Sequence, residues 1–187
     1  MLIYLHGFNS SPASHKAQML GRAMVDRGLG KHFLCPALPH RPGEALGAIE
    51  AAVANEPPHS ITFVGSSLGG YYATWLAEKH DLRAVLINPA VHPYRDLRAF
   101  LGAQQNLYTQ ENYELTEDHL SGWADLFVRT VTPSRYLLLV ETGDELLDYR
   151  EAVRKYAGAE QVVVQGGDHA LQSFPLYIAL ILDIAGF

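Results

Sequence analysis

The stretch Ile61–Ala73 reads ITFVGSSLGGYYA and decides the fold. Ile61–Val64 is a short apolar run, which predicts a strand buried inside the protein. Leu68–Lys79 follows at once with a helical pattern. Between them, Gly65-Ser66-Ser67-Leu68-Gly69 matches the motif G-x-S-x-G. Because the motif joins a strand to a helix, it predicts a nucleophile elbow with Ser67 at its apex.

The two glycines of the motif have a steric purpose. The turn of an elbow is so tight that side chains two positions either side of the nucleophile would collide, so Gly65 and Gly69 flank Ser67. The N–H groups at the start of the following helix point toward the same place and favour negative charge there. The alternative is a glycine-rich turn in which Ser67 only caps the helix.

Strand and helix patterns alternate along the rest of the chain, which predicts βαβ units and a doubly wound, mostly parallel sheet of about six strands. We expect strands at Leu2–Leu5, His32–Cys35, Ile61–Val64, Ala84–Ile87, Tyr136–Val140 and Gln161–Val164. We expect helices at Ser14–Arg27, Gly43–Asn55, Leu68–Lys79, Asp148–Tyr156 and Phe174–Ala185, with Pro57-Pro58 ending the second.

One segment, from about His92 to Pro133, contains no good strand pattern. A structureless loop of that length is improbable inside a domain, so we expect a mostly helical cap over one end of the sheet. The prediction is therefore a single domain over residues 1–187, with a cap insertion at about 92–133. Trp123 and Leu126 are candidates to line an apolar pocket for an acyl chain. Equally, they would form the cap's own core.

A serine hydroxyl needs a base before it can act as a nucleophile. Among nine histidines, His169 comes directly after the strand Gln161–Val164, at the sheet edge where ligands bind in α/β proteins. The others, including His40 and His119, have no such position. We therefore predict His169 as the base.

The base in turn needs a carboxylate to orient it. Asp144 lies just beyond the strand Tyr136–Val140, and the order Ser67, Asp144, His169 is that of α/β-hydrolase triads. Asp148 is better explained as a helix cap, and Glu145 as a solvated charge. We expect the Asp168 side chain to point away from its neighbour His169 and to order the loop.

Two backbone N–H groups are the candidate oxyanion hole. One belongs to Leu68, the residue after the predicted nucleophile. The other belongs to Phe8, in the loop His6-Gly7-Phe8-Asn9 that follows the first strand. His6 is interpreted as a histidine that braces this loop.

Composition narrows the function classes. A formal net charge of −6 and the absence of a Lys/Arg run argue against nucleic acid as a partner. A single cysteine, Cys35, and no signal-peptide or membrane-spanning pattern predict a cytoplasmic protein. No metal-ligand or nucleotide-binding motif is present, so we expect neither a metal nor a cofactor. The oligomeric state is left open.

The chain also resembles the YqiA-like bacterial esterase family. The segments that carry the resemblance are Tyr4–Pro12, Gly65–Ala73, Leu107–Thr109, Thr142–Glu145 and Gly166–His169. The resemblance covers essentially the whole chain. It implies a compact α/β-hydrolase with esterase activity on acyl esters, and its catalytic roles fall on Ser67, Asp144 and His169.

These patterns predict a serine esterase acting on a small acyl ester through an acyl-enzyme intermediate. One alternative is an acyl-CoA thioesterase, for which Arg95 and Arg98 are weak candidates to bind phosphate. Peptidase activity is a further enzymatic option, although nothing in the sequence selects an amide. An alternative of another class is a non-catalytic interaction module on a hydrolase scaffold.

Overall fold

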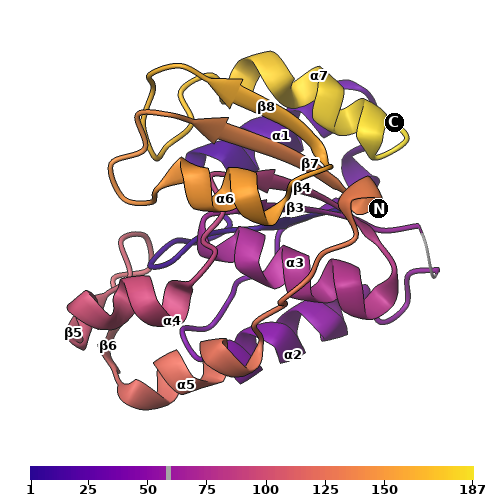
Figure 1. Ribbon diagram of the computed structural model, residues 1–187. Coiled ribbons are helices and arrows are strands. Elements are labelled where there is room, and N and C mark those ends of the chain that lie inside the picture. The colour runs from indigo at the N-terminus through magenta and orange to yellow at the C-terminus, as the bar shows by residue number, and fades with distance from the viewer. Residues whose placement is uncertain (58–59) are drawn as a thin grey trace.

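A parallel sheet forms the centre of the computed structural model, which describes residues 1–57 and 60–187 (Figure 1). Pro58, expected to help end a helix, lies outside these ranges. Within them, six strands pair in the order β2-β1-β3-β4-β7-β8, with every neighbouring pair parallel. The strands are β1 (Leu2–Leu5), β2 (Phe33–Leu34), β3 (Thr62–Ser66), β4 (Arg83–Ile87), β7 (Tyr136–Glu141) and β8 (Glu160–Val164). The predicted doubly wound α/β architecture is confirmed.

Helices cover both faces of this sheet (Figure 1). These helices are α1 (His15–Asp26), α2 (Pro42–Val53), α3 (Leu68–His80), α6 (Tyr149–Lys155) and α7 (Phe174–Ile184), and short 3-10 turns are η1 (Gly30–His32) and η3 (Pro133–Arg135). Buried residues of α1 and α7 pack on one face, and those of α2, α3 and α6 pack on the other. The strands are apolar on both faces, so each face has a helix layer to bury it.

Alternation along the strands explains how one apolar run serves both layers. In β4, Ala84 and Leu86 join the core beneath α3, whereas Val85 and Ile87 join the core beneath α1 and α7. Successive side chains of a strand point to opposite faces. A continuous apolar run is therefore what a strand covered on both sides requires.

The segment between β4 and β7 packs at one end of the sheet (Figure 1). It contains helices, as expected: α4 (Pro93–Asp96), η2 (Leu97–Phe100) and α5 (Glu117–Asp125). It also contains an antiparallel hairpin of β5 (Gly102–Gln105) and β6 (Asn112–Leu115), which the sequence pattern did not indicate. Polar residues fill most of this hairpin, so it lacks the apolar signal of a core strand.

Candidate active site

Ser67 lies at the sharp turn between β3 and α3, as predicted for an elbow. Its backbone has φ 55° and ψ −120°, a left-handed conformation that is unusual for a residue with a side chain. The Ser67 N–H donates to the carbonyl of Ile87 at 3.0 Å, and its own carbonyl accepts from the N–H of Ala90 at 3.1 Å. The neighbouring strand therefore holds the strained residue in place.

Close approach explains the flanking glycines. A Cβ on Gly65 would lie 2.4 Å from the carbonyl oxygen of Gly69, and one on Gly69 would lie 2.0 Å from that of Leu5. Both distances are far below any real contact, so a larger residue at either position would displace backbone. The predicted role of Gly65 and Gly69 in the turn agrees with this geometry.

Ser67, His169 and Asp144 form one hydrogen-bonded chain. The Ser67 hydroxyl lies 3.0 Å from Nε2 of His169. On the other side of the ring, Nδ1 of His169 lies 2.8 Å and 3.0 Å from the two carboxylate oxygens of Asp144. Three predicted residues from three sheet-edge loops are thus brought into the arrangement expected of nucleophile, base and orienting acid.

The loop after β7 fixes the Asp144 carboxylate. Its Oδ1 accepts from the N–H groups of Leu146 and Leu147, both at 2.9 Å, and the side chain is only 2% exposed. Asp148 caps α6 by accepting from the N–H of Arg150, as expected. Glu145 does more than expected, because its carboxylate accepts from the N–H of His169 at 2.9 Å. The Asp168 carboxylate orders the loop by accepting from the N–H of Ala170.

A second buried carboxylate, Glu141 at the end of β7, holds the loop that carries His169. It is 1% exposed and accepts from the N–H groups of Asp168, Gln172 and Ser173 at 2.8 to 3.0 Å. Burial alone would raise the pKa of Glu141, but these hydrogen bonds outweigh it and leave the pKa below its ordinary value. A Cβ on Gly167 would lie 2.0 Å from this carboxylate, so glycine is required there.

Asn88, at the end of β4, connects the same elements. Its Nδ2 donates to the carbonyls of Asp168 and His169, and its Oδ1 accepts from the N–H of Glu141 at 3.0 Å. Sequence reasoning assigned no role to either Asn88 or Glu141. The signal was present, because each is a polar residue directly at the carboxyl end of a buried strand, where a buried polar group must have partners.

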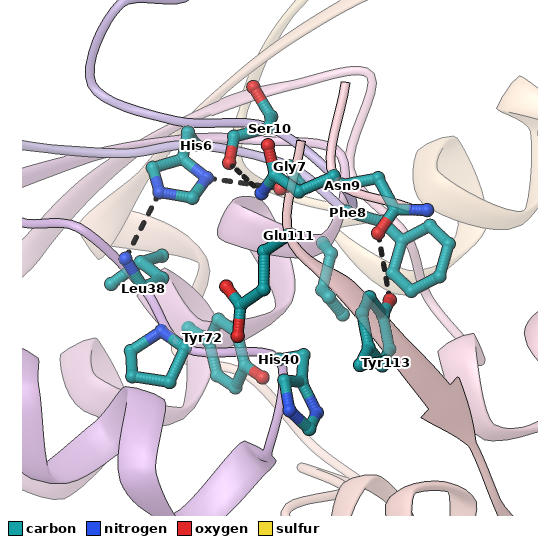
Figure 2. A pocket seen from close by; sticks show the side chains of 13 residues that line it. His6, Gly7, Phe8, Asn9, Ser10, Leu38, His40, Tyr72, Glu111 and Tyr113 are labelled. Carbon is teal, nitrogen blue, oxygen red and sulfur yellow. Dashed lines mark hydrogen bonds between the residues drawn. The ribbon is translucent and has the colours of Figure 1, made fainter. Parts of the chain in front are cut away.

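The two predicted oxyanion donors border a pocket of about 430 Å³, counted with its open mouth (Figure 2). Phe8 and Leu68 both line it, together with Gly7. A Cβ on Gly7 would lie 3.2 Å from the Cβ of Ser67, so the pocket adjoins the candidate nucleophile. His6 braces the loop as expected, since its Nε2 accepts from Leu38 N–H and its Nδ1–H donates to the Gly7 carbonyl.

Polar side chains line much of this pocket, contrary to the apolar wall considered from the sequence. They include Asn9, His40, Asn106, Glu111 and Tyr113. Trp123 does not line it, because its side chain is fully buried and packs in the core with Tyr71 and Tyr72. The alternative that Trp123 belongs to the core of the insertion is the one the structure supports.

The described residues contain no group of three or more His, Cys, Asp or Glu side chains that could hold a metal ion. None of the helices in the described ranges is long and apolar enough to cross a membrane.

Residues 1–186 match the model of the uncharacterised protein family UPF0227. The chain belongs to the UPF0227 family. A UPF0227 protein from Citrobacter koseri is 25% identical over 162 residues, which cover 83% of this chain and 81% of that protein. The family resemblance seen in the sequence is confirmed.

Solved structures similar to this UPF0227 chain are α/β-hydrolases. A putative hydrolase from Agrobacterium vitis S4 has a TM-score of 0.78 at 19% identity, covering 98% of this chain and 87% of that one. A chain from the work on LipS and LipT, two metagenome-derived lipolytic enzymes, has a TM-score of 0.70 at 17% identity, covering 99% and 92%. At such identities the likeness establishes the α/β-hydrolase fold.

Proposed function

We propose that this protein is a serine esterase that hydrolyses small carboxylic acyl esters. The observation that carries the proposal is the hydrogen-bonded chain from the Ser67 hydroxyl through His169 to the Asp144 carboxylate. Family membership alone does not supply a reaction, because the family is uncharacterised. The hydrolases and lipolytic enzymes among its structural neighbours support a hydrolase.

The proposed reaction has two steps. The Ser67 hydroxyl attacks the acyl carbonyl while Nε2 of His169 takes its proton, and His169 then protonates the departing alcohol. Water, deprotonated by His169, attacks the acyl-enzyme and releases the carboxylic acid. The Asp144 carboxylate accepts from Nδ1–H throughout, which keeps Nε2 free to accept the Ser67 proton.

The N–H groups of Phe8 and Leu68 are the proposed donors to the oxyanion of each tetrahedral intermediate. The left-handed conformation of Ser67 supports this role, because it projects the hydroxyl out of the turn beside Leu68. One such donor contributes about 2.7–4 kcal/mol of transition-state stabilisation. The strain at Ser67 thus serves the alignment of nucleophile and donors.

The two arginines considered for phosphate binding already form ion pairs within the protein, which favours an ester substrate over an acyl-CoA thioester. Arg95 pairs with Asp96 and Glu151, and Arg98 pairs with Glu117. A phosphate would have to compete with these carboxylates for each guanidinium. A test of Ser67 reactivity separates the esterase from a non-catalytic interaction module on the same scaffold.

The test is labelling with a fluorophosphonate, which reacts with activated serines, read by intact mass. The wild-type protein takes up a single label, and Ser67→Ala takes up none and loses several orders of magnitude in kcat on a short ester. Ser121→Ala, at an exposed position of α5, is the matched control and labels like wild type. Absence of labelling in folded wild-type protein, or a Ser67→Ala variant of normal turnover, contradicts the proposal.

A further inference from the structure

The pocket beside Phe8 and Leu68 contains polar groups that the proposed acyl-transfer steps do not use. Several of them are occupied by contacts within the protein. Asn9 accepts from the Tyr113 hydroxyl and donates to Gln104, and Asn106 donates to the carbonyl of Ser10. These side chains attach the β5–β6 hairpin to the loop after β1. They form the wall of the pocket, and because they are already hydrogen-bonded within the protein, other groups must determine which ligand the pocket binds.

His40 presents a hydrogen-bond donor whose position is set by a relay of contacts. The N–H of Thr116 donates to Nδ1 of His119 at 3.1 Å, so the His119 proton is on Nε2. That Nε2 lies 2.8 Å from Nδ1 of His40, to which it donates. With its Nδ1 occupied as an acceptor, His40 carries its own proton on Nε2. The relay therefore leaves His40 with an Nε2–H donor that has no acceptor in the part of the chain that the structure describes.

Tyr72, which also lines the pocket, supplies a second donor. Its hydroxyl oxygen accepts from Nε1–H of Trp123 at 2.7 Å. Within residues 1–57 and 60–187, no protein atom accepts the hydroxyl hydrogen of Tyr72 in turn. Burial raises the pKa of this hydroxyl, so it stays protonated and able to donate.

Glu111 supplies the acceptor. Its carboxylate has no hydrogen-bond or ion-pair partner among the described residues, and it is the only Asp, Glu, Lys or Arg among the residues that line the pocket. Figure 2 shows the Glu111 side chain reaching into the pocket toward Tyr72 and His40. The pocket thus offers two neutral donors and one anionic acceptor to a ligand.

We propose that this pocket binds the vicinal hydroxyl groups of a short hydroxyacyl ester, with Glu111 as the specificity-determining residue; the proposal rests on the esterase function above. A hydroxyl both donates and accepts, so two of them can satisfy Glu111, Tyr72 and His40 together. An ammonium group only donates and would leave both donors unpaired. A carboxylate or phosphate only accepts and would face the Glu111 charge.

The position of the pocket assigns it to the acyl part of the substrate. The leaving oxygen must come within hydrogen-bond reach of Nε2 of His169, which will protonate it. The lining includes Phe8 and Leu68, the proposed oxyanion donors, and Gly7, which adjoins Ser67, but it includes neither Ser67 itself nor His169. A group in this pocket is therefore attached to the carbonyl carbon rather than to the departing alcohol.

The test compares ethyl esters that differ only in the acyl group. Ethyl 2,3-dihydroxypropanoate and ethyl 2-methylbutanoate have the same shape, with hydroxyls in one where the other has methyl groups. Each kcat/KM is divided by the hydroxide-catalysed rate to remove intrinsic reactivity. Wild type prefers the dihydroxy ester by roughly tenfold, the worth of one hydrogen bond to a charged group. Ethyl 3-aminopropanoate and monoethyl succinate, cationic and anionic, are both poorer substrates than the dihydroxy ester.

Glu111→Gln lowers the preference to roughly threefold, since a neutral hydrogen bond has about half the strength of a charged one. Glu114→Gln removes the same charge from an equally exposed residue that does not line the pocket, so it is the matched control and keeps the full preference.

Several results would overturn the assignment. They are equal turnover of the two isosteric esters, better turnover of the charged ester, or a preference that survives Glu111→Gln in full. Ser67→Ala separates this failure from that of the esterase function. Ser67-dependent hydrolysis without a hydroxyl preference defeats the pocket assignment alone. No Ser67-dependent hydrolysis of any ester defeats the esterase proposal, and the pocket assignment with it.

Discussion

Glu141 shows how much of a catalytic arrangement depends on residues outside it. Three N–H groups of the loop that carries His169 end on this one buried carboxylate. The same loop is tied to β4 through Asn88. Backbone hydrogen bonds of this kind fix the loop without contacting the imidazole, so Glu141 and Asn88 are positioning residues for His169.

The lowered pKa of Glu141 leads to a prediction about stability and pH. The native state binds this proton more weakly than the unfolded chain, whose carboxyl titrates near 4.5. The stabilisation is therefore complete above that pH and is lost as the pH falls below it. We expect Glu141→Gln to cost about 1–3 kcal/mol at pH 7, the cost of a poorly satisfied buried group. Its stability should then fall less than that of wild type between about pH 6 and pH 3.

Urea unfolding at several pH values measures both effects. Glu160→Gln, an exposed substitution at the start of β8, is the control and should follow wild type. Parallel pH profiles for Glu141→Gln and wild type would show that the Glu141 carboxylate does not carry this linkage.

Single residues also show what sequence patterns can and cannot predict about the site. The positions of Ser67, Asp144 and His169 follow from one rule, because each comes directly after a strand of a parallel sheet and such loops meet at one edge. Glu111 and His40 obey no such rule. Both line one pocket because the β5–β6 hairpin folds back over the loop after β1 and because His40 stacks on Tyr113 of that hairpin.

At the level of elements, the agreement between the predicted and the observed strands depends on whether the strand is buried. The central strands were predicted to within two residues at each end, because burial on both faces produces a continuous apolar run. The β5–β6 hairpin was missed, since Gly102–Gln105 and Asn112–Leu115 are mostly polar. The two strands of the hairpin are held by hydrogen bonds from the Asn9 side chain, in the loop after β1, to Gln104 and Tyr113.

Asn106 tests this view of the hairpin. Its Oδ1 accepts from the N–H groups of Tyr108 and Thr109, and its Nδ2 holds the carbonyl of Ser10. We expect Asn106→Ala to speed amide hydrogen exchange over residues 107–111, with little change in Tm because the segment is exposed. Hydrogen–deuterium exchange read by mass spectrometry measures it, with Asn112→Ala as the control. Unchanged exchange in Asn106→Ala would mean that other contacts hold the hairpin.

On the scale of the whole molecule, the insertion and the sheet share a core. Trp123 and Leu120 from α5 pack in the same buried cluster as Tyr71 and Tyr72 from α3. Hydrogen bonds reinforce the contact, since the Tyr71 hydroxyl donates to the carbonyl of Trp123 and Trp123 Nε1–H donates to Tyr72. An insertion joined in this way unfolds with the body of the protein.

Trp123→Ala tests how strongly the insertion is joined to the body of the protein. We expect a loss of about 3–5 kcal/mol, the usual cost of removing a buried tryptophan, with one cooperative transition retained. Calorimetry and far-UV circular dichroism report the midpoint and the number of transitions. Leu107→Ala, at a side chain 73% exposed, is the control and stays within about 0.5 kcal/mol of wild type. Two separate transitions would show that the insertion unfolds independently.

The strand order has a consequence for how the protein is made. β1 precedes β3 in the chain and so leaves the ribosome before it, yet the two strands pair, and Leu5 lies directly beside Gly65. Until β3 has been synthesised, the apolar run Leu2–Leu5 has no partner on that edge. During this interval the nascent chain exposes an apolar strand with an unpaired edge. Chaperone binding or rapid collapse onto α1 must protect this strand from aggregation.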